Sequence, residues 1–346
     1  MKISPPAIPT HLTGSTTKAL QFLQRLTSGA KCMRRLALVA AAALPGISAA
    51  MGLTLEPASA NCSKSLPLVE AAPAAAAQRL MGSQAVRGQH DMAWVWLGSP
   101  TARYPHAALG SRTHAGSLHV LTRIQGLLRE VVYTLPLERV FEDLTVRLAD
   151  LDQDGRDEVI VIESDALLGS SLVVFGLEEN QRGVSATVSL VEKARSPPTG
   201  STFRWLNPVG VADFDGDGKL DLAAVITPHI GGVMTLYHYR PPQLVPFAKV
   251  MDTSNHLMGS PEQQLSVVLQ LPGKRPTIIV PDMSLKALHA LRWEGNGASA
   301  KFKELADVMS LTARVQRISV LPDTPGMACV LLADDTWLRL VLRDGH

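Results

Sequence analysis

The pattern of apolar and polar residues predicts short strands, rather than long helices, for most of this chain. Apolar residues occur at alternate positions or in short β-branched runs, as in 159-VIVI-162 and 233-VMTLYHY-239. The 26 glycines and 23 prolines interrupt such runs along the whole sequence. Alternation with a period of two, bounded by turn residues, is typical of β-strands joined by tight connections. We therefore expect an all-β protein.

One order of elements occurs twice in the chain. An acidic loop, a β-branched strand, a short connection and a second alternating strand follow one another in residues 148–177 and again in 211–239. Three weaker copies share the paired strands but lack the acids, and they lie in residues 92–124, 276–293 and 327–344. The sequence therefore predicts a repeat with units of roughly 50–65 residues, which is within the range of propeller-blade repeats.

The repeat predicts how the sheets are packed. A unit of this size with about four short strands matches one blade of a β-propeller. One such sheet cannot bury both of its faces, whereas sheets packed around an axis cover each other. We expect a β-propeller over residues 81–346, with five blades of about four antiparallel strands. Propellers of four, six or seven blades and a β-sandwich are the alternatives.

Each acidic loop carries carboxylates at its first, third, fifth and ninth positions: Asp150, Asp152, Asp154 and Glu158 in one, and Asp213, Asp215, Asp217 and Asp221 in the other. A glycine follows the third acid in both loops, where it permits a positive φ. Alternate residues of a tight loop can turn their carboxylates toward one centre, and Ca²⁺ takes six to eight oxygen ligands. The pattern predicts two structural Ca²⁺ sites, with the backbone carbonyls of Arg156 and Lys219 as further ligands.

The acidic loops have two alternative interpretations, an EF-hand and a plain Asp/Gly surface turn. An EF-hand requires a glutamate at position 12 and flanking helices. Position 12 is Val161 in one loop and Ala224 in the other, and a strand-like sequence follows both. The EF-hand is therefore excluded, and a plain Asp/Gly surface turn remains as the alternative to a metal site.

These residues resemble a known family. The segment 213-DFDGDGKLDLAAV-225 resembles the FG-GAP/VCBS repeat, the calcium-loop blade of integrin-α-type β-propellers. The segment 150-DLDQDGRDEVIVI-162 is similar, with Glu158 where the family usually has aspartate. The resemblance covers these two units well and the remaining units only in their strand pattern. It implies a secreted or surface propeller that usually serves as a recognition scaffold.

Two connections between paired strands carry a Pro-His sequence, 104-YPHAALG-110 and 227-TPHIGG-232. If both connections lie on one face of the propeller, Tyr104, His106 and His229 form a candidate pocket for a ligand or a metal. The alternative is that the two histidines are turn residues that form hydrogen bonds with the backbone.

The N-terminal region has the features of a targeting segment. The basic residues 34–35 precede an apolar run that ends in small residues at 48–50, with 58–60 as a second candidate cleavage end. The run is shorter than the roughly 20 residues that span a membrane. We expect residues 1–50 to be an extension plus a secretory signal, with Met33 as the candidate true start. Residues 51–80 are expected to be a flexible Ala/Pro linker.

Composition and cysteine content limit the possible functions. The net charge is +2 and the basic residues are scattered, which argues against a nucleic-acid partner. Downstream of the signal, Cys62 and Cys329 either form a disulfide, as an oxidising compartment allows, or remain unpaired with Cys329 buried. We expect an exported, periplasmic or extracellular protein without a stable membrane span.

No nucleophile, zinc-protease or phosphate-loop motif occurs in the sequence. The function that the family resemblance implies is that of a binding or scaffold module, here for an unknown protein or glycan. The alternative is a propeller enzyme that acts on polysaccharide or ester substrates.

Overall fold

The computed structural model describes residues 52–58, 62, 71–182, 185–321 and 324–343, which all belong to the unit Ser48–His346. Its elements are 22 strands and two short 3-10 helices, η1 (Ala74–Gln78) and η2 (Gly297–Ser299). The prediction of an all-β protein is confirmed. Among the described residues, no helix has the length and apolar character needed to cross a membrane.

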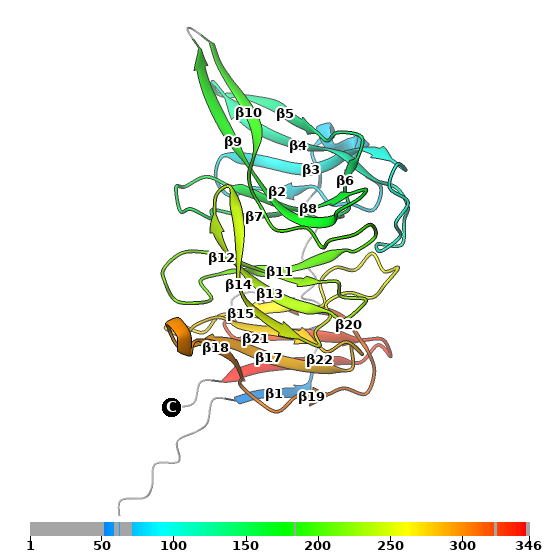
Figure 1. The fold of residues 1–346 in the computed structure, drawn as a ribbon, viewed down its shortest axis with the longest axis vertical. Coiled ribbons are helices and arrows are strands. Elements are labelled where there is room, and N and C mark those ends of the chain that lie inside the picture. The colour runs from blue at the N-terminus through cyan, green and yellow to red at the C-terminus, as the bar shows by residue number, and fades with distance from the viewer. Residues whose placement is uncertain (1–51, 59–61, 63–70, 183–184, 322–323, 344–346) are drawn as a thin grey trace, which may run out of the picture. The chain divides into compact units, whose positions relative to one another are not determined.

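The described strands form three sheets of 13, five and four strands, and within them five groups of four antiparallel strands follow one another in the chain (Figure 1). Group 1 is β2 (Val86–Arg87), β3 (Met92–Thr101), β4 (His114–Ile124) and β5 (Leu127–Thr134). Group 2 is β7 (Arg147–Ala149), β8 (Glu158–Asp165), β9 (Gly169–Arg182) and β10 (Ser185–Arg195). Group 3 is β11 (Leu206–Ala212), β12 (Asp221–Ile226), β13 (Val233–Arg240) and β14 (Gln243–Met251).

The remaining groups have the same order. Group 4 is β15 (Val267–Leu269), β16 (Thr277–Pro281), β17 (Ala287–Glu294) and β18 (Lys301–Glu304), with the short β19 (Met309–Ser310) paired to β17. Group 5 is β20 (Val315–Val320), β21 (Met327–Leu332), β22 (Trp337–Arg343) and, from the other end of the chain, β1 (Gly52–Pro57). β6 (Arg139–Phe141) pairs with both β4 and β8 and so joins groups 1 and 2. No sheet closes on itself within the described residues.

The strand pairs expected from the sequence are those that the structure contains. The β-branched strand of each expected unit is the second strand of its group: β3, β8, β12, β16 or β21. In β8 all residues but the last are buried, because both faces of the sheet are covered. The number of propeller blades and the closure of a ring stay predictions.

The expected linker over residues 51–80 contains regular structure. Gly52–Pro57 forms β1, which pairs along its whole length with β22. Leu53 packs into the core of groups 4 and 5, and Glu56 accepts hydrogen bonds from Arg339 and Arg343. Two alternating leucines were too weak a signal to predict a strand, since the strand is fixed by a partner almost 300 residues away. Residues 1–50, including Met33 and the expected signal, lie outside the described residues.

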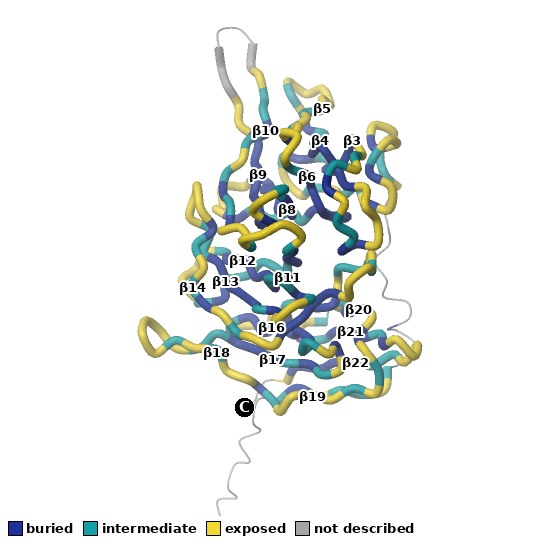
Figure 2. The backbone as a smooth tube through the Cα atoms, turned by 45° about the vertical axis from the view of Figure 1, so that its right-hand side comes forward, coloured by how far each residue is buried: buried dark blue, intermediate teal, exposed yellow. Residues whose placement is uncertain are grey.

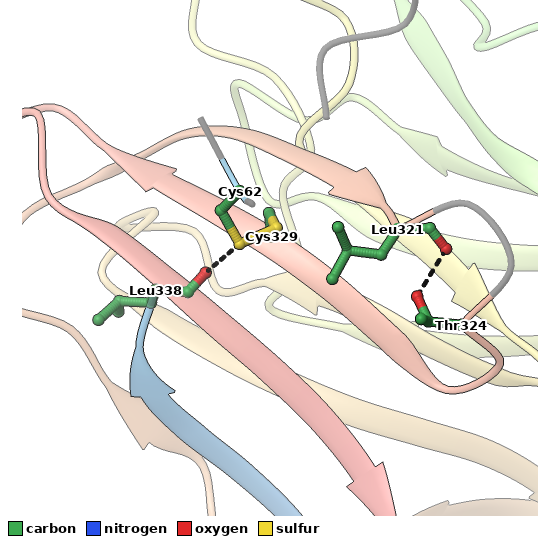
Figure 3. Close-up of a disulfide and its surroundings, with 5 residues drawn as sticks. All are labelled: Cys62, Leu321, Thr324, Cys329 and Leu338. Carbon is green, nitrogen blue, oxygen red and sulfur yellow. Dashed lines mark hydrogen bonds between the residues drawn. A yellow bond between two sulfur atoms is a disulfide. The ribbon is translucent and has the colours of Figure 1, made fainter. Parts of the chain in front are cut away.

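A disulfide attaches the next described residue to the same sheet. Cys62 is bonded to Cys329, which is fully buried at the middle of β21. Figure 3 shows the bond beside β22, where the Sγ atom of Cys62 lies 4.0 Å from the carbonyl oxygen of Leu338. Of the two alternatives for these cysteines, the structure contains the pair.

The buried residues form a continuous series of cores rather than one centre. One cluster lies in groups 1 and 2 and reaches group 3, a second lies between groups 3 and 4, and a third joins groups 4 and 5. Figure 2 shows the buried strands of successive groups, with exposed residues concentrated in the connections. Trp205 is fully buried within the first of these clusters, and Trp96 is fully buried as well.

Strand direction assigns the connections to two opposite edges. Because neighbouring strands within a group are antiparallel, the connection from the first to the second strand and the connection from the third to the fourth strand lie at the same edge. Both acidic loops lie at this edge, which is called the acidic edge here. The second–third connections and the segments between groups lie at the opposite edge. The two Pro-His connections, residues 102–113 and 227–232, are both at this opposite edge.

Candidate metal centres and the opposite edge

The two acidic loops follow the same backbone course. They connect the first and second strands of groups 2 and 3. At the fourth position φ is +61° for Gln153 and +76° for Gly216, and at the sixth position it is +85° for Gly155 and +87° for Gly218. A Cβ atom on Gly155 or Gly218 would meet no atom within 4 Å. Glycine is therefore needed at the sixth position for its backbone conformation and not for space.

The first acid of each loop holds the turn together. Asp150 accepts hydrogen bonds from the backbone N–H groups of Asp154 and Gly155, both at 2.9 Å. Asp213 likewise accepts from the N–H groups of Gly216, at 2.7 Å, and Gly218, at 3.0 Å. The same side chain therefore curls the same loop in both groups.

The ninth residue closes each loop from the first position of the second strand. Glu158 accepts a hydrogen bond from the N–H of Leu151 at 2.7 Å, and Asp221 accepts one from Phe214 at 3.2 Å. In both cases the donor is the second residue of the loop. Glu158 is longer by one methylene but makes the corresponding contact, so the glutamate is compatible with the loop.

These contacts gather carboxylates around one centre in each loop. Oxygen atoms of Asp150, Asp152 and Glu158 lie within 4.8 Å of one another, and so do those of Asp213, Asp215 and Asp217. Such oxygen donors fit a hard divalent cation. Asp154 is not in the first set; its Oδ1 accepts a hydrogen bond from the N–H of Arg156 at 2.9 Å.

The buried acids at the ninth positions are electrostatically unfavourable without a cation. Burial, together with the negative charges of Asp152, Asp154 and Asp150, raises the pKa of Glu158 to about 7. Burial also raises the pKa of Asp221 to about 6, opposed by a hydrogen bond from His238 and assisted by the charge of Asp215. A bound cation would offset this repulsion, since an opposite charge nearby favours the ionised form of a carboxyl group.

The side chains at the seventh positions of the two loops, Arg156 and Lys219, do not face the carboxylates in the same way. The guanidinium of Arg156 donates to Asp91 at 2.8 Å, which attaches the first loop to group 1, whereas Lys219 is exposed. The two loops also contact each other, because Gln153 Nε2 donates to the carbonyl oxygen of Gly218 at 3.0 Å. The metal-binding roles of the Arg156 and Lys219 carbonyls stay predictions.

The structure adds one residue that the sequence analysis missed. His238 lies on β13 directly opposite Asp221, with its Nδ1 3.0 Å from Asp221 Oδ1 and its Nε2 4.0 Å from Asp215 Oδ2. Asp215, Asp221 and His238 form a further set of candidate metal ligands. The only signal for this histidine is the register between β12 and β13, which the loop motif does not contain.

The comparison with protein families agrees with these loops. Residues 150–224 match the family model for the FG-GAP-like repeat. The chain contains an FG-GAP-like repeat. The matched segment begins at the first acid of the first loop, includes the whole second loop and ends within β12. A comparison with curated proteins finds no match.

At the opposite edge of this protein, the three residues of the candidate pocket meet around one segment, Phe203–Trp205. The ring of His106 stacks on Phe203 with centroids 5.2 Å apart. The hydroxyl oxygen of Tyr104 accepts a hydrogen bond from the N–H of Phe203 at 2.9 Å. His229 stacks on Trp205 with centroids 5.8 Å apart. Both Pro-His connections therefore contact the same segment, and the pocket itself stays a prediction.

Each of the two histidines also has a buried polar partner. His106 Nδ1 lies 2.7 Å from Oε1 of Glu142, whose side chain is fully buried. His229 Nε2 lies 2.8 Å from His256 Nδ1, and His256 Nε2 is 2.9 Å from the carbonyl oxygen of Ser260. Because a carbonyl only accepts, neutral His256 donates through Nε2 and accepts from His229 through Nδ1. Side-chain pairs, and not the backbone alone, hold these histidines.

The His229–His256 pair predicts that the protein loses stability in mild acid. Burial and the neighbouring His229 lower the pKa of His256 to about 3, and burial and His106 lower that of His229 to about 4. An unfolded histidine titrates near 6.5. Below that pH the unfolded state binds more protons, so the free energy of unfolding falls from about pH 6.5 toward pH 4.

Urea unfolding at several pH values between 7 and 4.5 measures this dependence. His256→Asn keeps an acceptor near the position of Nδ1 but cannot titrate, so its free energy of unfolding should fall less steeply than that of the wild type. Other groups that titrate in this range contribute equally to both proteins. Parallel curves for the two proteins would show that the pair is not responsible.

Proposed function

We propose that this chain is an exported, cation-stabilised β-propeller that serves as a binding or scaffold module for a protein or glycan. The observation that carries the proposal is the hydrogen-bond pattern shared by the two acidic loops. The same two positions, Asp150 and Glu158 in one loop and Asp213 and Asp221 in the other, hold the same backbone N–H groups. A plain Asp/Gly surface turn does not require the same hydrogen bonds at the same loop positions in two successive groups.

The arrangement of strands supports five propeller blades of four antiparallel strands. The groups follow one another in the chain, and strands of groups 2 to 5 are in contact with the next group: β9 with β11, β11 with β15, and β15 with β20. β1 completes group 5, so the beginning and the end of the described chain share one sheet. This pairing covers the edge of β22 that would otherwise be left unpaired at the end of the last group.

Each acidic loop is proposed to hold one structural divalent cation, with Ca²⁺ as the ion that oxygen donors favour. Asp150, Asp152 and Glu158 would hold the ion of the first loop, and the aspartates of residues 213–221 that of the second. A bound cation would supply positive charge to compensate the gathered carboxylates. The protein contributes the curled loop and fixes the entry into β8 and β12.

Export is supported by the cysteines and by the position of β1. A disulfide such as Cys62–Cys329 persists in oxidising compartments, which include the periplasm and the extracellular space. β1 begins at Gly52, so cleavage after residues 48–50 keeps this strand, whereas cleavage after 58–60 removes it. The first of the two candidate cleavage ends is therefore the one we propose.

The binding role is supported by apolar side chains exposed at the opposite edge. The exposed fractions are 79% for Leu167, 60% for Ile230 and 44% for Phe203. Their connections contact each other: Thr202 Oγ1 donates to the carbonyl oxygen of Ala166, and His229 stacks on Trp205 next to Phe203. Exposed apolar residues on adjoining connections are typical of interaction surfaces.

Chelation tests the proposed cation sites. Removing divalent cations with EDTA should lower the melting temperature by several degrees, and adding Ca²⁺ should restore it, because a ligand that binds only the native state stabilises that state. The double variant Glu158→Gln, Asp215→Asn, which changes a candidate ligand in each loop, should melt at the same temperature with and without EDTA. Asp307→Asn, at an exposed acid outside both loops, is the control and should respond like the wild type. A wild-type melting curve that ignores EDTA would refute the proposal.

A further inference from the structure

The two acidic loops differ in what stands opposite their ninth residue. In group 3, Asp221 pairs across the strands with His238. In group 2 the register places Gly176 opposite Glu158, one residue beyond the pair Val159–Phe175. A Cβ atom on Gly176 would lie 2.9 Å from the side chain of Lys193, which occupies this space. The second loop therefore has an imidazole at the point where the first loop has none.

The ring of His238 is held in place and faces the loop with both nitrogens. It stacks on Phe247 with centroids 4.0 Å apart and planes 11° from parallel. One nitrogen is 3.0 Å from Asp221 Oδ1 and the other 4.0 Å from Asp215 Oδ2. Packing against the phenyl ring limits the rotamers of His238, so little order has to be imposed when a ligand binds.

The imidazole changes the chemistry of the donors. Ca²⁺ takes oxygen ligands, whereas imidazole suits Zn²⁺ and other borderline transition-metal ions. Among the described residues, the set around the first loop consists of carboxylates only. The second loop offers two sets that share Asp215: three aspartates, or Asp215 and Asp221 with His238. The mixed set includes the buried Asp221, at 1% exposure, so its ion is shielded from water more than one held by the loop aspartates alone.

We propose that the second loop uses His238 to hold a borderline divalent cation such as Zn²⁺, while the first loop retains a preference for Ca²⁺. This inference rests on the proposed function, because it assumes that the loops are cation sites, and it names the ion of one of them. The two loops of one chain would then take ions of different chemistry.

Calorimetric titration of the metal-free full chain with Zn²⁺ and, separately, with Ca²⁺ tests the inference. The wild type should bind one Zn²⁺ at least about tenfold more tightly than Ca²⁺ at the second loop, and the variant Glu158→Gln, which disables the first loop, should keep this Zn²⁺ site. His238→Gln should weaken Zn²⁺ binding by about 10- to 100-fold or more, while Ca²⁺ affinity changes by less than about threefold.

His289 provides a matched control. Like His238 it lies on the third strand of its group, its side chain is 17% exposed, and its Nδ1 faces a carboxylate, Glu304, at 3.2 Å. Group 4 has no acidic loop in residues 270–276. His289→Gln should therefore leave the affinities for both ions unchanged. Equal Zn²⁺ affinity in His238→Gln and His289→Gln would overturn the inference.

A second measurement does not depend on the folding of a variant. In a crystal of the wild type soaked with Zn²⁺, the anomalous peak should lie about 2.0–2.1 Å from a ring nitrogen of His238. A peak surrounded by carboxylates alone would overturn the inference and leave the proposed cation sites intact. If the wild type bound neither Ca²⁺ nor Zn²⁺, both the inference and the proposed cation sites would fail.

Discussion

Replacing Cys62 with serine is expected to lower the free energy of unfolding by up to about 5 kcal/mol, because the disulfide closes a very long loop of the unfolded chain. Cys62 and Cys329 are separated by 267 positions in the sequence. In the native protein the bond adds little constraint, since β1 and β22 already pair beside it. Most of the effect should therefore arise in the unfolded state. Urea unfolding under non-reducing conditions measures it.

Reduction of the wild type is the control for the cysteine variant. A reductant should shift the unfolding midpoint of the wild type toward that of Cys62→Ser and should not shift the variant further. If the wild type and Cys62→Ser unfolded at the same urea concentration without reductant, the proposed stabilisation would be disproved.

Truncation of Trp205 to alanine is expected to cost about 3–5 kcal/mol, the usual range for a large buried aromatic residue. Its side chain is 1% exposed and packs against His229 and His256. Its Nε1 donates to the carbonyl oxygen of Glu142 at 3.0 Å, which links the segment before group 3 to the segment between groups 1 and 2. The alanine variant loses the packing, the hydrogen bond and the support of the histidine pair together. Chemical denaturation measures the loss.

Two companion variants separate these contributions. Trp205→Phe keeps most of the apolar volume and should cost about 1–2 kcal/mol, mainly because the carbonyl oxygen of Glu142 loses its donor. Trp337→Ala removes a half-buried tryptophan from β22 and should cost less than Trp205→Ala. A Trp205→Ala variant as stable as Trp337→Ala would contradict the central position assigned to this residue.

The acidic loops show how far a local motif can be interpreted. The glycine at the sixth position predicts a positive φ, and Gly155 and Gly218 have it. The loop and the strand after it were therefore predictable, because a few neighbouring residues fix both. Gln153 takes a positive φ without being glycine, and its contact with Gly218 of the other loop was not predictable. That contact depends on how groups 2 and 3 are placed beside each other.

The residues missed by the sequence analysis are partners from other strands. His238 is invisible in the loop motif because it reaches Asp221 only through the register of β12 and β13. Glu142 lies in a segment between groups and has no motif of its own, yet it pairs with His106. β1, within the segment expected to be a linker, was not predicted for the same reason, since this strand exists through its pairing with β22.

The sequence by itself determined the all-β class, the repeated order of loop and strands, and the FG-GAP-type loops with their candidate ligands. These features arise from local alternation and from glycine at fixed positions, so short windows of sequence contain them. Only the tertiary structure decided that the first described strand belongs with the last group, that Cys62 pairs with Cys329, and that His238 faces the second loop. Each of these depends on contacts between residues far apart in the chain, whose partners are set by packing of the whole unit and not by their neighbours in sequence.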